Sequence, residues 1–318
     1  MRFALLPEQR MFADSLRGML SEADVPKAVR AWSHGDHGPG LALWSALGGT
    51  GAFALTVDEE HGGAGLLPVE LVTAMVEFGR HAVPGPVVET AVAATVLADP
   101  DRLSAIAEGS LMATLAHPEA VPYALDADAA DLALAWDGEV LREAVAGEPA
   151  PRSLDPARRL YTWTPGTPTG YREPEEQPYD LGGLACAAQA LGVGEHLLAT
   201  TVDYVGSREQ FGRPVGGFQA VKHQLADVFT GLSFARPLVY AAALSHGTPE
   251  FVRDVSAAKV SASEAAYAAA RTALQLHGAI GYTDEYDLSL WIRKARALRS
   301  AWGDPARHRE RLAAVLTG

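Results

Sequence analysis

The amino-acid sequence predicts a mainly α-helical protein in which a small β-domain separates two helical parts. Apolar residues first recur at helical spacing, for example Phe12, Leu16 and Leu20, as in an amphipathic helix. Short apolar runs with turn residues follow, which are typical of strands, and the last part is Ala-rich and helical again. We therefore expect an N-terminal helical domain (1–110), a reduced middle β-domain (111–170) and a C-terminal helical bundle resembling a four-helix bundle (175–318).

The N-terminal domain is predicted from two amphipathic stretches. Pro7 stands in an early turn of the stretch that contains Phe12. The second stretch places Leu71, Met75 and Phe78 three or four residues apart and reaches Gly79. Residues at this spacing share one face of a helix, so both stretches can pack against a core.

The middle β-domain is predicted from four short runs, at residues 111–115, 132–136, 139–141 and 159–163. Asp137-Gly138 lies between the second and third runs, and this dipeptide is typical of a tight hairpin turn. A stretch rich in Pro, Gly and Glu, residues 164–178, is expected to be the loop that closes the domain.

Long helices are expected from Leu181 onward. One of them contains Pro237, which we expect to bend it; its apolar positions are Val221, Leu225, Val228 and Leu232. Asp254 is the expected N-cap of a helix that reaches His277. The last strongly patterned helix carries one apolar stripe, formed by Leu288, Trp291, Ile292, Ala295, Leu298 and Trp302.

Composition limits the classes of protein that the chain can represent. The 318 residues are 48% hydrophobic, as in an ordinary globular protein. The single cysteine, Cys186, excludes an internal disulfide and is consistent with the reducing cytoplasm. No basic segment followed by an apolar core begins the chain, so no signal peptide is expected. Residues 181–201 contain Glu195 and His196, which favours a buried helix over a membrane span.

The net charge of −13 argues against a nucleic-acid partner, because phosphate backbones require a positive surface. Against this acidic background, a local group of cations is more informative. The group consists of Arg208, Arg213, Lys222 and Arg236. These residues can bind an anionic dinucleotide or coenzyme A, and for Lys222 and Arg236 a solvated helix face explains them equally well.

The most informative segment runs from residue 204 to residue 219. It places Arg208 at the end of a helix, a turn at Phe211-Gly212, and the pair Phe218-Gln219 before the next long helix. An arginine at such a point offers a fork of donors to a phosphate or pyrophosphate. Taken alone, Arg208 is explained equally well as a residue that caps its own helix.

A second informative segment spans residues 274–286. Its helix is expected to stop at Gly278, and the next helix is expected to begin near Asp287. Gly-rich backbone between them can lie close to a cofactor because no Cβ stands in the way.

Together these segments resemble the acyl-CoA dehydrogenase family. The first resembles the family's R-x-x-F-G…F/H-Q signature, and the second resembles Q-x-x-G-G-x-G, with Ala279 in place of the second Gly. Residues 43–65 and 77–80 also resemble the family's N-terminal blocks. The resemblance implies contacts to the adenosine-diphosphate side of FAD by Arg208, Gln210, Phe211, Gly212, Phe218, Gln219, Gln275, Gly278 and Ala279.

The catalytic base of the family is missing. Removal of the α-proton needs a carboxylate within reach of the substrate, and most relatives have a Glu where this chain has Trp302. A second group of relatives places the Glu at the position of about Gly182. Asp304 and Asp180 lie nearby in sequence, but a shift of one or two residues re-aims a side chain, and such misplacement is costly.

The family's flavin-facing motif in the β-domain is also reduced. It should fall near residues 115–119, where only Pro118 matches. The chain therefore keeps one half of an FAD site and has lost the other half together with the base.

In the family each FAD lies across a subunit interface, so the resemblance implies a heteromer. The chain is similar to the short β-type subunits of α2β2 acyl-CoA dehydrogenases of bacterial sterol degradation. A longer subunit would supply the catalytic Glu, a bulky acyl-CoA would be the substrate, and an electron-transfer acceptor would reoxidise the flavin. Two alternatives remain open: a self-sufficient homomeric dehydrogenase using Asp304, and a non-catalytic scaffold that has lost FAD.

Other polar residues are interpreted structurally. His277, at a helix end, is expected to pack or form hydrogen bonds rather than act as a base, and Cys186 is expected in the core. His308 is expected on a solvated helix face with Arg307, Arg309 and Arg311. No metal site is expected, because His34, His37 and the Glu195-His196 pair lack a spacing that closes one.

Overall fold

The computed structural model describes residues 5–117, 121–136, 140–150, 152–171 and 178–317. The N-terminal part consists of helices joined by short turns, as the sequence predicts. Its α-helices are α1 (Pro7–Glu22), α2 (Val25–Ser33), α3 (Gly38–Gly48), α4 (Pro68–Arg80), α5 (Val87–Val96) and α6 (Pro100–Ala107). Two short 3-10 turns, η1 (Ala54–Thr56) and η2 (Glu59–His61), connect α3 to α4.

The β-domain is a five-stranded sheet with the strand order β1-β3-β4-β5-β2. Its strands are β1 (Ala113–Ala116), β2 (Ala124–Leu125), β3 (Leu132–Trp136), β4 (Leu141–Pro149) and β5 (Leu160–Pro168). β1 and β3 are parallel, and the other neighbours are antiparallel. All four predicted runs contribute to strands, but β4 and β5 extend further than expected and β2 was not predicted. The predicted Asp137-Gly138 turn lies outside the described residues.

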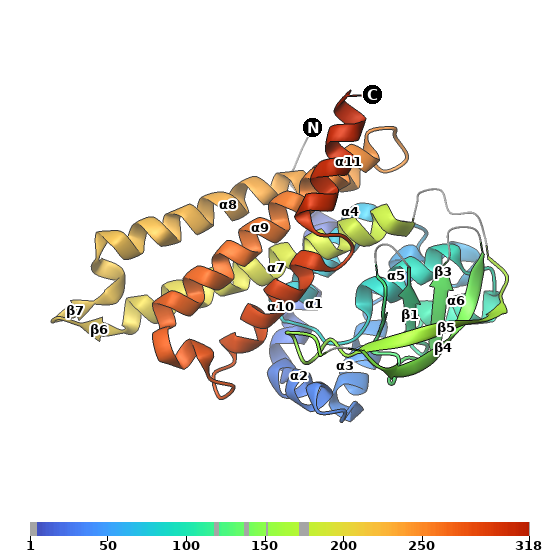
Figure 1. The fold of residues 1–318 in the computed structure, drawn as a ribbon, viewed down its shortest axis with the longest axis horizontal. Helices are drawn as coiled ribbons and strands as arrows, with labels where there is room; N and C mark the ends of the chain where they lie inside the picture. The colour runs from blue at the N-terminus through green and yellow to red at the C-terminus, as the bar shows by residue number, and fades with distance from the viewer. Residues whose placement is uncertain (1–4, 118–120, 137–139, 151, 172–177, 318) are drawn as a thin grey trace.

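The C-terminal part contains five helices. They are α7 (Pro178–Ser207), α8 (Gln219–Leu244), α9 (Phe251–His277), α10 (Leu288–Ser300) and α11 (Pro305–Thr317). A two-stranded hairpin, β6 (Glu209–Gln210) and β7 (Arg213–Pro214), and the 3-10 turn η3 (Val215–Gly217) connect α7 to α8. The 3-10 turn η4 (Gly278–Tyr282) follows α9. Figure 1 shows this bundle extending away from the sheet, with the hairpin at its far end.

Two predictions for these helices were wrong. Asp254 is not an N-cap, since α9 begins one turn earlier, with Glu250 at the N-cap and Asp254 in the first turn. Trp302 does not continue the apolar stripe of α10, because the helix ends at Ser300. Pro237 does lie within α8.

The N-terminal part and the bundle pack directly against each other through α4 and α7. A Cβ at Gly79 would overlap the carbonyl oxygen of Gln189, and a Cβ at Gly192 would overlap that of Val76. The two backbones therefore approach more closely than any larger residue permits. Trp291 adds a link from α10, because its indole N–H donates to the carbonyl of Arg80 at 3.0 Å.

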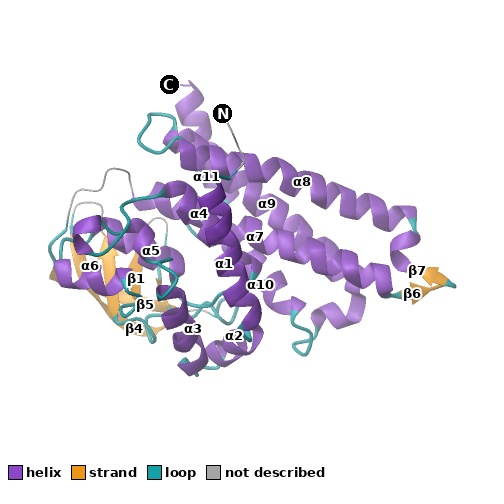
Figure 2. Ribbon diagram, turned by 180° about the vertical axis from the view of Figure 1, so that it is seen from behind, coloured by secondary structure: helices purple, strands orange, loops and turns teal. Residues whose placement is uncertain are grey.

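α7 is central to the molecule, and all its residues from Pro178 to Gly194 are buried. Figure 2 shows α7 behind α1 and α4 and beside α8 and α9, while α5 and α6 cover the sheet. Within the described ranges, no helix is both long enough and apolar enough to cross a membrane.

Candidate functional site: an exposed end of the bundle and a buried tryptophan

The two segments that the sequence singles out meet at one end of the bundle. Tyr204, near the end of α7, stacks on His277, the last residue of α9, with ring centroids 4.1 Å apart. Figures 1 and 2 both place the β6–β7 hairpin and the end of α9 at the end of the molecule farthest from the five-stranded sheet. The structure thus brings together two stretches that are about 70 residues apart in sequence.

His277 holds this junction in place. Its Nδ1–H donates to the carbonyl of Ala273 at 2.8 Å, and its Nε2 lies 3.4 Å from the hydroxyl of Tyr286, which can donate to it. Burial lowers the pKa of His277, so the ring is neutral near pH 7. Both nitrogens are engaged in this arrangement, which supports the structural interpretation of His277.

The hairpin is a tight turn whose tip is open to solvent. Gln210 pairs with Arg213, and the two residues between them, Phe211 and Gly212, have positive φ angles of 54° and 77°. Two successive positive φ angles are typical of the turn that best matches strand twist. Phe211 is 92% exposed, so most of its side chain faces solvent.

The start of α8 lies directly behind this tip. Phe218 is its N-cap and Gln219 its first residue, and the guanidinium of Arg213 lies 3.9 Å from the centroid of the Phe218 ring. Phe211 contacts the same ring edge-on at 6.2 Å. Free N–H groups at a helix start favour an anion.

Arg208 is the first residue after α7, and its side chain is exposed. Its backbone N–H donates to the carbonyl of Tyr204 at 2.9 Å. Among the described residues, the guanidinium forms no hydrogen bond with a carbonyl of α7. The geometry therefore favours an arginine that is available to a ligand over one that caps its own helix.

The end of α9 offers bare backbone next to the hairpin. Gly278 closes the helix with φ 63°, ψ −138°, a conformation that residues with a Cβ rarely adopt. Gln275 and Ala279 are both exposed on either side of it. All nine predicted FAD contacts are thus partly or fully accessible at this end of the molecule, and they suit a phosphate-bearing, extended ligand. Their role as FAD contacts stays a prediction.

Gly182, near the opposite end of α7, and Trp302, after α10, are the two positions at which the resemblance places the family's base, and the structure packs them against each other. Gly182 is in the first turns of α7, and a Cβ at this position would overlap the six-membered ring of Trp302. Trp302 is 1% exposed. Its indole therefore fills the space in which a carboxylate from either position would have to lie.

Trp302 and its turn are held by buried hydrogen bonds that offset a strained backbone. Its Nε1–H donates to Oε1 of the buried Glu89, on α5, at 3.1 Å. Its own backbone has a positive φ of 55°, a conformation that costs free energy for a residue with a Cβ. The buried ammonium of Lys259 stabilises the turn by donating to the carbonyls of Leu298 and Gly303, each at 3.1 Å.

His308 also supports this turn, and the expectation of a solvated His308 was wrong. The side chain is fully buried, and its Nε2–H donates to the carbonyl of Trp302 at 2.8 Å. Burial lowers its pKa from 6.5 to about 4. The neighbouring arginines suggested a solvated helix, but they lie on the other faces of α11, and His308 lies on its buried face.

The two substitute carboxylates have structural partners. Asp304 is exposed, and its Oδ1 accepts the backbone N–H of Arg307 at 2.9 Å, which caps the start of α11. Asp180 is buried, and its two carboxylate oxygens accept hydrogen bonds from the two terminal nitrogens of Arg311, at 2.7 and 3.1 Å. Neither arrangement leaves a carboxylate poised for proton removal, because one caps a helix and the other is neutralised by an arginine.

The remaining predicted residues are placed as follows. In the β-domain, Leu115 and Ala116 are buried in β1, and Pro118 lies outside the described residues. Lys222 is exposed, whereas Arg236 is bound to Glu195, with its Nε 3.0 Å from Oε1. No group of three or more His, Cys, Asp or Glu residues suited to a metal ion occurs in the described part of the chain.

Sequence reasoning missed Glu89. The signal was present, since Glu89 is the only charged residue in the otherwise apolar or small helix α5. A buried carboxylate requires a partner, but the sequence could not identify a tryptophan more than 200 residues away as that partner.

Comparison with known proteins now assigns the class. Residues 6–100 match the N-terminal domain of acyl-CoA dehydrogenases, and residues 177–317 match their C-terminal domain. The chain belongs to the acyl-CoA dehydrogenase family.

Particular relatives match nearly the whole chain. It is 33% identical to acyl-CoA dehydrogenase IpdE2 of Mycolicibacterium smegmatis, over 96% of this chain and 98% of the relative. It is 35% identical to IpdE2 of Mycobacterium tuberculosis, over 91% of each chain. The fold is also that of the ChsE4-ChsE5 complex from Mycobacterium tuberculosis, with a TM-score of 0.84, 20% identity and 99% of each chain covered. Butyryl-CoA dehydrogenase from Megasphaera elsdenii gives a TM-score of 0.81, with 20% identity and 100% of each chain covered.

Proposed function

We propose that this protein is the base-less subunit of a heteromeric, FAD-dependent acyl-CoA dehydrogenase. It contributes the Arg208, Gln210–Gly212, Phe218-Gln219 and Gln275–Ala279 contacts to the adenosine diphosphate of an FAD held mainly by its partner. The partner is a longer subunit that supplies the catalytic Glu, in an α2β2 assembly.

One observation carries this proposal: the proposed cofactor contacts are exposed, whereas the predicted position of the base is buried. The residues for the diphosphate side are exposed at the end of the bundle, whereas the base position is packed shut by Trp302 on Gly182. A homomer would need both halves open in every subunit. In a heteromer, one subunit can supply the diphosphate contacts while its unlike partner supplies the base.

The diphosphate end fits its ligand chemically. An exposed arginine supplies a planar fork for phosphate oxygens, the start of α8 supplies N–H groups, and the turn at Gly212 lets backbone approach closely. The flavin supplies the hydride acceptor of α,β-dehydrogenation. The residues of this chain position the cofactor and take no part in proton removal.

Exposed apolar residues support a subunit contact along α8. Phe229 and Phe234 are 62% and 69% exposed, and Leu238 and Leu244 are also exposed on the same helix. Large aromatic side chains of this kind are enriched in protein interfaces. From Phe229 to Leu244, this surface lies along α8, the helix that follows the hairpin and η3.

The substrate class is proposed from relatives alone. Solved structures with the same fold include one described as a steroid acyl-CoA dehydrogenase, Tcur3481-Tcur3483, with a TM-score of 0.85 at 23% identity over 97% of each chain. We propose a bulky, sterol-derived acyl-CoA, with an electron-transfer acceptor that reoxidises the flavin. Cys186, buried and unpaired with any other cysteine, is consistent with a cytoplasmic location.

The visible absorption spectrum of the purified protein tests the proposal. The chain alone should show no flavin bands, and co-purification with a longer acyl-CoA dehydrogenase subunit should give one FAD per pair of unlike subunits. Full flavin content and activity in the lone chain would instead support the homomeric alternative. If Arg208→Ala left the flavin content of the complex unchanged, the scaffold alternative would be favoured.

A further inference from the structure

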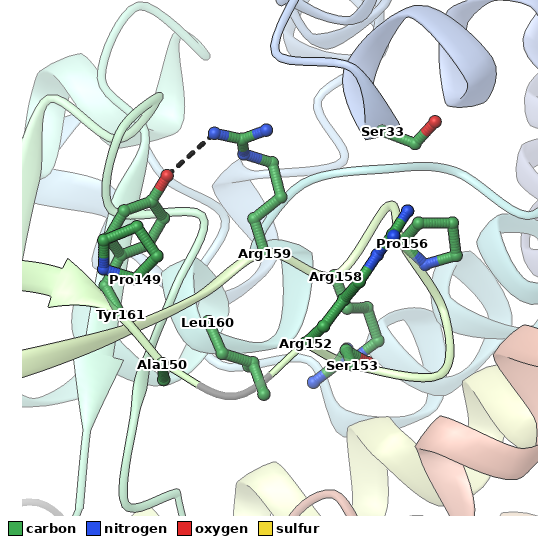
Figure 3. A pocket seen from close by; sticks show the side chains of 10 residues that line it. All are labelled: Ser33, Pro149, Ala150, Arg152, Ser153, Pro156, Arg158, Arg159, Leu160 and Tyr161. Carbon is green, nitrogen blue, oxygen red and sulfur yellow. Dashed lines mark hydrogen bonds between the residues drawn. The ribbon is translucent and has the colours of Figure 1, made fainter.

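A second cationic feature lies away from the exposed end of the bundle. A cavity of about 200 Å³ opens between the end of α2 and the connection from β4 to β5. Figure 3 shows its lining, in which Ser33 comes from α2 and the other side chains come from the connection and the adjoining strand ends. We call this cavity the arginine pocket, after its residues Arg152, Arg158 and Arg159.

The charge of the arginine pocket is opposite to that of the whole protein. Three of its ten described lining residues are arginines, and the described lining contains no Asp or Glu. The chain as a whole has 26 Lys and Arg against 39 Asp and Glu. Arginine side chains that line a concave site make it positive, and a positive site attracts an anion.

Nearby carboxylates neutralise only part of this charge. Asp128 lies 2.6 Å from a terminal nitrogen of Arg159, which also donates to the Tyr161 hydroxyl at 2.8 Å. The Nε of Arg159 is buried and has no hydrogen-bond partner among the described residues. Asp155 is directed elsewhere, with one oxygen accepting the N–H of Ala157 and the other 3.9 Å from Lys294.

Arg152 and Arg158 therefore provide most of the charge available to a ligand. Arg152 is exposed and Arg158 is half-buried, so neither is sealed inside the protein. Ser33 contributes little as a donor, because its hydroxyl already donates to the carbonyl of Arg30 at 2.7 Å. The site is thus built for charge rather than for a network of neutral hydrogen bonds.

We propose that the arginine pocket binds the phosphate group of a phosphate monoester. Guanidinium forks match phosphate oxygens geometrically, and the volume suits a phosphate group with a short attachment. A second cavity of about 430 Å³ shares Ser153, Arg158 and Leu160 with the pocket. It gives the organic part of the ligand room to extend toward Ala297 and Ala301.

Titration calorimetry on the full chain at low ionic strength tests this site. Three probes are compared: inorganic phosphate, coenzyme A and 3′-dephospho-coenzyme A. Tighter binding of coenzyme A than of its dephospho form would identify the 3′-phosphate as the source. If inorganic phosphate binds and the two coenzymes bind with equal affinity, the site takes free phosphate, which contradicts a monoester ligand. Tighter binding of coenzyme A supports the proposal only if it depends on the arginines.

Variants of the pocket arginines test whether binding depends on them. Arg152→Gln and Arg158→Gln should each weaken the phosphate-dependent binding about tenfold, and Arg158→Lys should retain part of it because the charge remains. Arg10→Gln, an exposed arginine on α1, is the matched control and should have no effect. Thermal unfolding shows whether each variant is folded, and Arg152 carries the test alone if Arg158→Gln is not.

The proposal is overturned if neither inorganic phosphate nor coenzyme A binds, or if binding is the same in Arg152→Gln as in the unchanged protein. Neither outcome depends on flavin. A failure here is therefore distinct from a failure of the proposed subunit role, which is measured by the flavin content of the complex.

Discussion

The indole of Trp302 donates to the buried carboxylate of Glu89 across 3.1 Å, and thereby joins the turn after α10 to helix α5. The space at the predicted base position is thus part of the hydrophobic core. A buried indole N–H or a buried carboxylate without a hydrogen-bond partner would lower the stability of the fold. This hydrogen bond gives each group its partner. The sealed position is therefore an interior contact with its own contribution to stability.

We expect Trp302→Ala to lower the free energy of unfolding by about 3–5 kcal/mol, because it removes a large buried side chain and leaves Glu89 without its donor. Trp302→Phe should cost less, since most of the ring packing remains. Urea unfolding of both variants checks the order. Equal losses for the two would show that packing of the ring contributes little.

Gly182 should tolerate no side chain while Trp302 is present. Gly182→Ala should lower the free energy of unfolding by more than about 2 kcal/mol, because its Cβ would overlap the indole. Gly206→Ala, on the same helix with nothing within 4 Å of the added Cβ, is the control and should be neutral or slightly stabilising.

A double-mutant cycle tests the contact directly. In a Trp302→Ala background, Gly182→Ala should cost much less than in the unchanged protein, because the obstacle is gone. Additive losses would contradict the contact. The same cycle with Gly206→Ala should be additive.

Arg208→Gln should weaken FAD binding by the purified complex about 10- to 100-fold, since a hydrogen bond to a charged group contributes roughly 1.5–3 kcal/mol. Flavin retained after dilution and gel filtration measures the change. Arg10→Gln, which is far from the bundle end, should retain normal flavin content. Loss of subunit association in Arg208→Gln would indicate an interface role instead.

Acid should weaken the turn that His308 holds. The folded-state pKa of His308 is about 4, below the ordinary value near 6.5, so the unfolded chain binds the proton more readily. Stability from this group is complete well above pH 6.5 and is lost as the pH falls through 6.5 toward 4. Between pH 6.5 and 5 the loss should be about 1.5 kcal/mol.

The comparison with His308→Gln isolates this effect. The variant should be less stable than the unchanged protein at pH 6.5, and the difference should shrink by pH 5, because only the unchanged protein loses the contribution. His196, whose pKa is also lowered to about 4, is present in both proteins and cancels. A constant difference across this pH range would exclude His308 as the source.

Local sequence pattern was sufficient for the long helices. The run from Leu181 lies in α7, and the predicted stop at Gly278 is the observed C-cap of α9. Family membership was also read correctly, because its signatures combine turns and helix ends that are fixed by nearby residues. The domain boundaries and the FAD contacts stay predictions.

Contacts between distant parts of the chain were beyond local reasoning. Nothing near Gly182 indicates that a tryptophan 120 positions later lies on it. β5 was predicted too short because Pro165 and Pro168 argue against a strand, yet its last residues pair only with β4, and proline is tolerated at such an edge.

The length of α7 has a consequence for cofactor binding. Gly182 and Tyr204 lie on one continuous helix, 204 − 182 = 22 residues apart, and a rise of about 1.5 Å per residue separates them by roughly 33 Å. The helix therefore fixes the distance between the Trp302 position and the diphosphate end. Flavin chemistry and diphosphate binding on the same subunit would thus concern two different cofactor molecules, so that sealing one end need not affect the other.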